Sequence, residues 1–278
     1  MITEKQISEY KKEGFLVIRN LLSTEEAFDW NRKCEELADK NGFTKNQTFA
    51  PANLARFEQF HSIILEERLL EILDYLVGKK VCFTQQSDFQ MNTDGGGWHR
   101  DSIDNKFGIG SDWDESEEDY DCVRVIFYLG DKDTEREYLK VLPRSHYLNP
   151  LSIKIEMYIR QKINYYLNRF KSLQYFGLPR RVEDWVSSLF MKSHTVSSKP
   201  GDCVIFCQKL YHLAIRQSEY KSAIFLSYGS RNIHSRNLRG TFRYKEKYRA
   251  SGYGEFPIDF EQKLKDTGRF VEATPTKG

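Results

Sequence analysis

The spacing of apolar residues in the first eighty positions predicts helices interrupted by one short strand. Thr3 precedes a polar amphipathic run that ends at Gly14, which is the pattern of a capped helix. Ser23 and Glu26 form a capping box at the start of a second, longer run with apolar residues at helical spacing. Residues 44–58 are predicted to be a loop. The expected elements are helices over residues 4–13, 24–40 and 60–76 and a strand over residues 15–20.

From Val81 onward the pattern changes to that of strands, with short apolar runs bounded by turn residues. Residues 149–192 interrupt this pattern with amphipathic helical spacing, so they form an insertion that is either a lid or an added packing layer. The tail from Asn232 is polar and is predicted to be irregular. The expected strands cover residues 81–92, 122–129, 138–142, 194–198, 203–207 and 223–228.

Short strands behind N-terminal helices are typical of a double-sheet jelly roll. We therefore predict a mainly β protein with flanking helices, a cupin-like double-stranded β-helix. The expected organisation is a single domain over residues 1–278 with the helical insertion at about 149–192.

Composition favours a globular enzyme over the other broad classes of protein. The chain has 278 residues, of which 40% are hydrophobic and 14% aromatic, and its net charge of +2 argues against non-specific nucleic-acid binding. Five cysteines with no regular spacing indicate neither a disulfide framework nor a zinc motif. The polar N-terminus is unlike a signal peptide, and no apolar run approaches the roughly 18 residues of a membrane span. We expect a cytoplasmic protein, monomeric or homodimeric, with no nucleic-acid or membrane partner.

The most informative stretch is Trp98-His99-Arg100-Asp101, which follows three consecutive glycines. Side chains alternate along an extended segment, so His99 and Asp101 point to the same side and can hold one metal ion together. A second histidine must come from elsewhere, and His212 is the best candidate. Two histidines and one carboxylate on one face of iron leave other positions open for ligands. The rival histidines are His146, in a Pro-x-Ser-His turn, and His194, at the start of a strand.

These motifs, taken in order, resemble those of the phytanoyl-CoA dioxygenase-like family of iron(II)- and 2-oxoglutarate-dependent oxygenases. The resemblance covers about residues 5–230 without the insertion. The matching elements are Tyr10-x-x-x-Gly14-Phe15-x-Val17-Ile18, Trp98-His99-x-Asp101, Leu139-x-Val141-Leu142-Pro143-x-Ser145-His146, and Pro200-Gly201-Asp202 leading to His212.

The resemblance implies a jelly roll in which His99, Asp101 and His212 hold Fe(II) and 2-oxoglutarate chelates the iron. It also implies a reaction with molecular oxygen that hydroxylates or otherwise oxidises an unactivated carbon of a small molecule, with release of succinate and CO2. Halogenating relatives replace the carboxylate ligand by a small residue, so Asp101 argues against halogenation.

The chain departs from the family at the residue expected to bind the distal carboxylate of 2-oxoglutarate. The family usually places an arginine there, roughly ten residues after the second histidine, because a carboxylate in a narrow barrel must be paired. Here Lys221 stands just before the next strand, and it can form an ion pair but not a two-pronged fork. Arg124 on a central strand and Arg216 are the alternatives, in that order.

Further residues are candidates for the rim of the site. Gln85, Gln90 and Trp98 are expected to line the pocket, and Tyr211 is expected to support His212. The acidic run at residues 112–121 could attract a cationic substrate, and the basic tail could hold an anionic one. Each is equally explained as solvated surface, so the charge of the substrate stays open. The basic tail residues are Arg236, Arg239, Arg243, Lys245, Lys247 and Arg249.

Two other functions remain open from the sequence. One is a non-catalytic jelly-roll module that binds a ligand and carries a vestigial metal site, which the missing arginine would favour. The other is a cupin-like metalloenzyme that does not use 2-oxoglutarate. Dependence on 2-oxoglutarate distinguishes both from the oxygenase.

Overall fold

The computed structural model describes residues 2–44, 47, 53–92, 98–101, 118–130, 132–147, 155, 158–159, 162, 192–215, 220–250 and 252–274. Most of the predicted insertion, Gly95–Gly97 and most of the acidic run lie outside these residues. Among the residues that are described, no helix is both long and apolar enough to cross a membrane.

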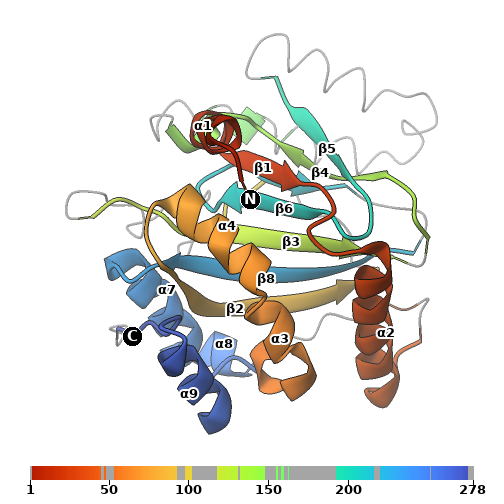
Figure 1. Ribbon diagram of the computed structural model, residues 1–278, viewed down its shortest axis with the longest axis vertical. Helices are drawn as coiled ribbons and strands as arrows, with labels where there is room; N and C mark the ends of the chain where they lie inside the picture. Colours follow the sequence, from red (N-terminus) through yellow and green to blue (C-terminus); the bar gives the residue numbers. More distant parts are fainter. Residues whose placement is uncertain are drawn as a thin grey trace.

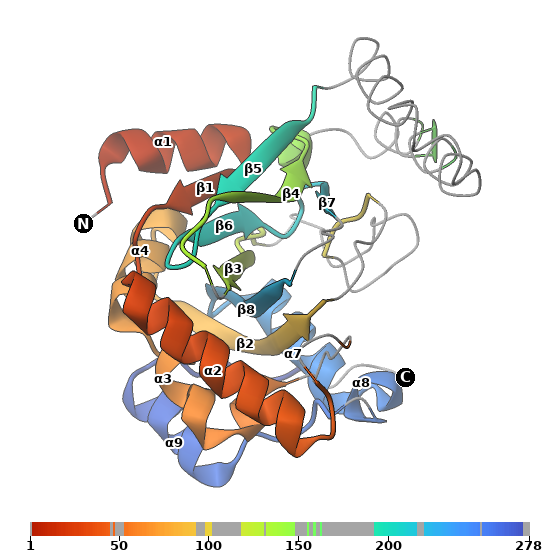
Figure 2. The ribbon, with the colours of Figure 1, turned by 90° about the vertical axis from the view of Figure 1, so that its right-hand side faces the viewer.

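Two antiparallel sheets face each other and form the predicted jelly roll (Figures 1 and 2). The larger sheet has the order β1-β6-β3-β8-β2, and the smaller sheet has the order β5-β4-β7. The strands of the larger sheet are β1 (Phe15–Ile18), β6 (Cys203–Cys207), β3 (Val123–Leu129), β8 (Ser222–Ser230) and β2 (Val81–Met91). The strands of the smaller sheet are β5 (His194–Ser198), β4 (Arg136–Val141) and β7 (His212–Ala214).

Helices cover the outer face of the larger sheet, as Figure 2 shows for α2, α3, α4 and α9. The predicted cap at Thr3 before α1 and the predicted capping box at Ser23 before α2 are both present, and Thr3 also forms a capping box, with Gln6. The predicted helix over residues 60–76 is divided at Leu65, and Glu66 accepts a hydrogen bond from the backbone at the start of α4. These elements are α1 (Glu4–Glu13), α2 (Thr24–Lys40), α3 (His61–Ile64) and α4 (Glu67–Val77), with 3₁₀ turns η1 (Leu54–Arg56), η2 (Glu58–Phe60) and η4 (Ser145–Tyr147).

The central strand β3 is buried on both faces, so its alternating residues belong to two separate cores. Val125 and Phe127 face the helices and join the larger core with residues of α2, α3 and α4. Ile126 and Tyr128 face the space between the two sheets and pack with β4, β5 and β6. This inner space is where a jelly roll can hold a ligand.

The C-terminal tail is helical, so the prediction of an irregular tail is wrong. It forms α7 (Ile233–Tyr244), α8 (Glu246–Ala250) and α9 (Ile258–Asp266). Asn232 caps α7 by accepting a hydrogen bond from the amide of Ser235. The inward face of α7 is largely polar and includes His234 and the fully buried Arg239, which hides the apolar periodicity of a packed helix. Arg239 lies between the rings of Phe256 and Phe270 and donates to a backbone oxygen, so its charge is satisfied inside this layer.

Candidate metal centre

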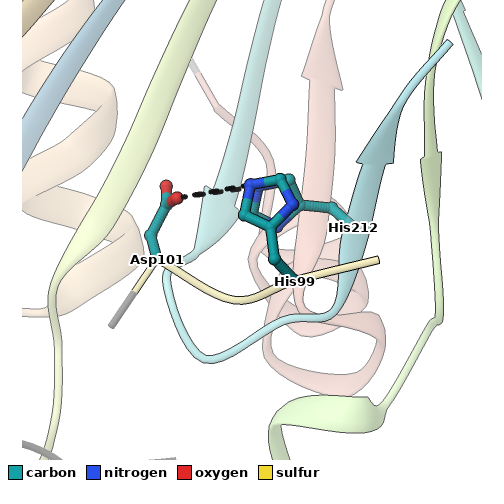
Figure 3. A group of neighbouring side chains, drawn as sticks. All are labelled: His99, Asp101 and His212. Atoms are coloured by element: carbon teal, nitrogen blue, oxygen red, sulfur yellow. Dashed lines mark ion pairs between the residues drawn. The ribbon is translucent and has the colours of Figure 1, made fainter. Parts of the chain in front are cut away.

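His99, Asp101 and His212 meet at one end of the space between the sheets (Figure 3). Their potential ligand atoms all lie within 4.8 Å of one another. Oδ1 of Asp101 is 3.9 Å from Nε2 of His99 and 3.7 Å from Nε2 of His212. The structure therefore brings together the three residues that the motif spacing selected as ligands.

Backbone pairing fixes the relative positions of the two histidines. The amide of His99 donates to the carbonyl of His212 at 3.0 Å, and the amide of His212 donates back to His99 at 2.9 Å. The amide of Asp101 donates to the carbonyl of Gln208 at 3.1 Å. The segment 98–101 thus pairs with the chain at the start of β7, and buried Trp98 anchors it in a small core with Leu142 and Tyr211.

His212 is held in the tautomer that a metal ligand needs. Its Nδ1 lies 3.0 Å from the carbonyl oxygen of Leu210, so Nδ1 carries the proton and Nε2 presents its lone pair to Asp101. Burial, reinforced by His99, lowers the pKa of His212 to about 4. Because a metal binds neutral imidazole, this ring is ready to bind at neutral pH without losing a proton.

Asp101 is the anionic member of the triad and stays charged. Burial opposes its charge, but His212, Arg124 and His99 together lower its pKa below the usual value. Nε of Arg124 lies 3.6 Å from Oδ2 of Asp101, on the oxygen that is not directed at the histidines. The centre therefore combines two imidazoles with one ionised carboxylate.

Arg124 forms hydrogen bonds with neighbouring side chains inside the barrel. Its Nη2 donates to Asp88 at 2.9 Å, and its Nη1 donates to the hydroxyl of Ser227 at 2.7 Å. Tyr253, from the segment after α8, donates its hydroxyl proton to the other oxygen of Asp88. Sequence reasoning missed Asp88 and Tyr253, because only the fold places the C-terminal segment beside β2.

Lys221 lies immediately before β8 and is only 2% exposed. Among the described residues no carboxylate forms an ion pair with it. Its Nζ lies 5.9 Å from the centre of the Tyr128 ring. Burial alone lowers its pKa to about 8. Of the other two predicted cosubstrate residues, Arg216 lies outside the described residues. The side-chain amide of Gln85 donates to the carbonyl of Gly254.

A cavity of about 280 Å³ connects the triad to the interior of the barrel. Arg124, Ile126 and Tyr128 line it along β3, so it follows that strand away from the metal-binding end toward Lys221. Gln90 lines it as predicted, whereas Gln85 is not among its described lining residues. The remaining described lining residues are His99, Asp101, Leu139, Phe206, His212, Ala214 and Phe225.

The rival histidines lie away from this cavity. His146 contacts the carbonyl of Lys11 through Nε2 at 3.1 Å, and His194 packs against Phe15 with ring centres 5.3 Å apart. In the basic tail, Arg243 pairs with Glu255 at 2.6 Å. None of these residues lines the cavity, so among the described histidines only His99 and His212 are placed to bind a metal there.

The donor set fits a divalent transition metal. Metal–ligand bonds of about 2.1 Å place neighbouring ligand atoms about 3 Å apart, so small side-chain rotations would close the observed separations onto an ion. Two imidazoles and a carboxylate on one side are the ligands of non-haem iron(II) oxygenases, whose remaining positions are open. A half-exposed His99, at 48%, leaves one side of the centre accessible from outside.

A sequence model of one protein family matches most of the chain. The model of the phytanoyl-CoA dioxygenase (PhyH) family matches residues 10–219. The chain belongs to this family. The resemblance expected from the four motifs is therefore confirmed, and the match includes the PhyH-type His-x-Asp motif and His212. No curated protein matches the chain significantly.

Solved structures with the same fold include proteins described as non-haem and 2-oxoglutarate-dependent enzymes. HygX from Streptomyces hygroscopicus, solved with nickel and 2-oxoglutarate bound, is 18% identical over 94% of this chain and 100% of its own, with a TM-score of 0.58. The 2-oxoglutarate-dependent carbocyclase SnoK from nogalamycin biosynthesis is 16% identical over 83% and 85%, with a TM-score of 0.58. EctD from S. alaskensis, solved with 2-oxoglutarate and 5-hydroxyectoine, is 14% identical over 83% and 77%, with a TM-score of 0.54. The predicted cofactors, iron and 2-oxoglutarate, thus occur in proteins of this fold.

Proposed function

We propose that this PhyH-family protein is an Fe(II)- and 2-oxoglutarate-dependent oxygenase that hydroxylates an unactivated carbon of a small molecule, with succinate and CO2 as co-products. The observation that carries the proposal is the arrangement of charges around one cavity. An anionic metal-ligand set lies at one end, and a buried ammonium without a carboxylate partner among the described residues lies beyond the other. A dicarboxylate could chelate a metal at the first end and pair its other carboxylate with the ammonium at the second.

His99, Asp101 and His212 would hold the iron. When bound, the iron would use 2-oxoglutarate as a reductant to activate molecular oxygen, the oxidant for attack on a carbon–hydrogen bond. The protein's own residues hold the two imidazoles and the ionised carboxylate in place before any ligand arrives. No side chain has to act as a general acid or base.

Lys221 is the best candidate for binding the distal carboxylate of 2-oxoglutarate. Burying an ammonium without a counter-charge is costly, so the site favours an anion that arrives with the ligand. Arg124 is the weaker candidate, because its guanidinium already faces Asp88 and Asp101. Tyr128 lies between the cavity and Lys221, where its ring would flank the bound carboxylate.

Apolar walls would protect the reaction from water. Ile126, Leu139, Phe206 and Phe225 line the cavity between the two charged ends. In such surroundings the ion pair at Lys221 is strengthened and the reacting centre is kept dry. Structures of this fold include a carbocyclase, an epimerase and EctD with 5-hydroxyectoine bound, so the oxidation could also end in another product.

The test is conversion of 2-oxoglutarate by the iron-loaded protein in air. We expect 2-oxoglutarate labelled at C1, the carboxyl next to the keto group, to release labelled CO2 and an equal amount of succinate, slowly alone and faster with a substrate. His212→Ala should abolish this release, whereas His146→Ala, which alters a histidine outside the cavity, should retain it. Release that is equal in wild type and His212→Ala would refute the proposal. Binding of 2-oxoglutarate without any succinate would favour the ligand-binding module.

A further inference from the structure

The two oxygens of Asp101 face different partners. Oδ1 is directed at Nε2 of His99 and of His212, at 3.9 and 3.7 Å, whereas Oδ2 faces Nε of Arg124 at 3.6 Å. One oxygen is thus directed into the metal centre and the other toward a cation. The His-x-Asp motif alone does not predict the partner of Oδ2, because Arg124 comes from a different segment of the chain.

Arg124 is itself held rigidly on three sides. Its guanidinium contacts Asp88 through Nη2, Ser227 through Nη1 and Asp101 through Nε. The side chain is buried on the central strand β3, between β6 and β8. A planar guanidinium whose three nitrogens are all engaged has one orientation. It therefore also fixes the positions of the groups that it contacts.

The C-terminal layer contributes to this arrangement through Tyr253. Its hydroxyl donates to Oδ1 of Asp88, while Oδ2 of Asp88 accepts from Arg124. Tyr253 packs in a core with Leu238 and Phe242 of α7. These residues lie beyond the family match, which ends at residue 219. A chain of contacts therefore leads from the C-terminal helices to the metal centre.

We infer that Arg124 is a positioning residue that keeps Asp101 as a one-oxygen ligand, and that Asp88 and Tyr253 hold Arg124 in place. This inference rests on the proposed metal site. With Oδ2 held by Arg124, Asp101 would offer only Oδ1, so Asp101 and the two histidines would supply three ligand atoms to a bound metal. Room would then remain on the metal for a two-point chelating cosubstrate and oxygen. A carboxylate released from Arg124 could offer both oxygens and close one of these positions.

The test uses Co(II), whose visible spectrum reports the number of ligands, and needs no turnover. Arg124→Met should still bind Co(II), but the spectrum without 2-oxoglutarate should change, and 2-oxoglutarate should bind at least tenfold more weakly. Arg124→Lys should restore part of the wild-type Co(II) spectrum and part of the affinity for 2-oxoglutarate. Tyr253→Phe, which keeps every charge, should shift both readouts in the same direction by a smaller factor. The matched control is Tyr228→Phe, which removes a buried tyrosine hydroxyl that donates to the carbonyl of Ile64 rather than to the groups around Arg124, and it should stay within twofold of wild type.

The outcomes separate this inference from the proposed function. If Arg124 only contacted 2-oxoglutarate, Arg124→Met would leave the spectrum of the 2-oxoglutarate-free Co(II) protein unchanged, and that result overturns the inference. An effect of Tyr228→Phe as large as that of Tyr253→Phe also overturns it. Should Arg124→Met fail to fold, the comparison of Tyr253→Phe with Tyr228→Phe decides the matter. A wild-type protein that binds no Co(II) refutes the metal site itself.

Discussion

Nζ of Lys221 lies 5.9 Å from the centre of the Tyr128 ring, on the inner side of the barrel. The face of an aromatic ring attracts a cation, but it does not replace a carboxylate. Burial accordingly lowers the pKa of Lys221 to about 8. Tyr128 also lines the cavity that contains the triad, so one side chain contacts both the cavity and the surroundings of Lys221.

Binding of 2-oxoglutarate should therefore weaken as the pH rises through 8. Only the protonated ammonium pairs with a carboxylate, so a group with a pKa of about 8 should cost about tenfold in affinity between pH 7 and pH 9. Lys221→Arg should abolish this dependence, because arginine remains protonated over that range. Titration of 2-oxoglutarate into the Co(II)-loaded protein at several pH values measures the effect. The same pH response in Lys221→Arg would exclude Lys221 as its source.

Lys221 should also limit the stability of the ligand-free protein. Its pKa is about 8 when folded and about 10.4 when unfolded, so the unfolded chain binds more protons between these values and the free energy of unfolding rises with pH there. At pH 7 this cost is present in full. Lys221→Met should raise the free energy of unfolding at pH 7 by on the order of 1–3 kcal/mol and remove the rise above pH 8.

Denaturant unfolding at pH 7 and pH 9.5 measures this difference. Lys79→Met alters an exposed lysine and is the matched control, with an expected change within about 0.5 kcal/mol. A Lys221→Met variant that is less stable than wild type at pH 7 would show that the ammonium has a partner in the folded protein.

Two glycines at helix ends should differ in their tolerance of alanine. Gly14 after α1 and Gly78 after α4 both have positive φ, 85° and 72°, and both donate to the last helical turn. A Cβ at Gly78 meets nothing within 4 Å, whereas a Cβ at Gly14 would lie 2.5 Å from Nδ1 of His146. Gly78→Ala should cost about 1 kcal/mol from the backbone alone, and Gly14→Ala about 1–3 kcal/mol more. Thermal unfolding of the two variants tests this, and equal losses would contradict it.

Removal of His212 should weaken metal binding far more than removal of His146. His212→Ala should weaken Ni(II) binding by about two orders of magnitude or more, because its imidazole and tautomer are built into the site. His146→Ala should leave the affinity within about twofold, since His146 contacts Lys11 outside the cavity. Calorimetric titration of both variants measures this. A larger loss in His146→Ala would mean that the metal binds elsewhere.

Local patterns sufficed where the cause of the structure is local. The caps at Thr3 and Ser23 and the apolar run of β3 need only neighbouring residues. His99 and Asp101 could be paired because two residues of extended chain separate them. The helical tail was missed because α7 buries polar side chains such as Arg239, whose partners at Val271 and Phe270 lie about thirty positions away in the sequence.

Arg124 illustrates the limit of sequence reasoning at the site. A buried arginine on a central strand demands an anion, and 2-oxoglutarate was one candidate. The fold supplies two protein carboxylates instead, Asp88 from β2 and Asp101 from the segment before β3. Both pairings depend on strand order and register, which the spacing of residues along the chain does not encode. The same holds for Tyr253, which reaches Asp88 from the C-terminal layer.

Anaerobic titration of the protein with Fe(II) and 2-oxoglutarate tests the central claim most directly. We predict the weak visible charge-transfer band of an iron–2-oxoglutarate chelate in the wild type, its loss in His212→Ala, and its appearance only at much higher 2-oxoglutarate concentration in Lys221→Ala. Iron that binds tightly without producing any band would contradict the account and favour a metalloenzyme that does not use 2-oxoglutarate.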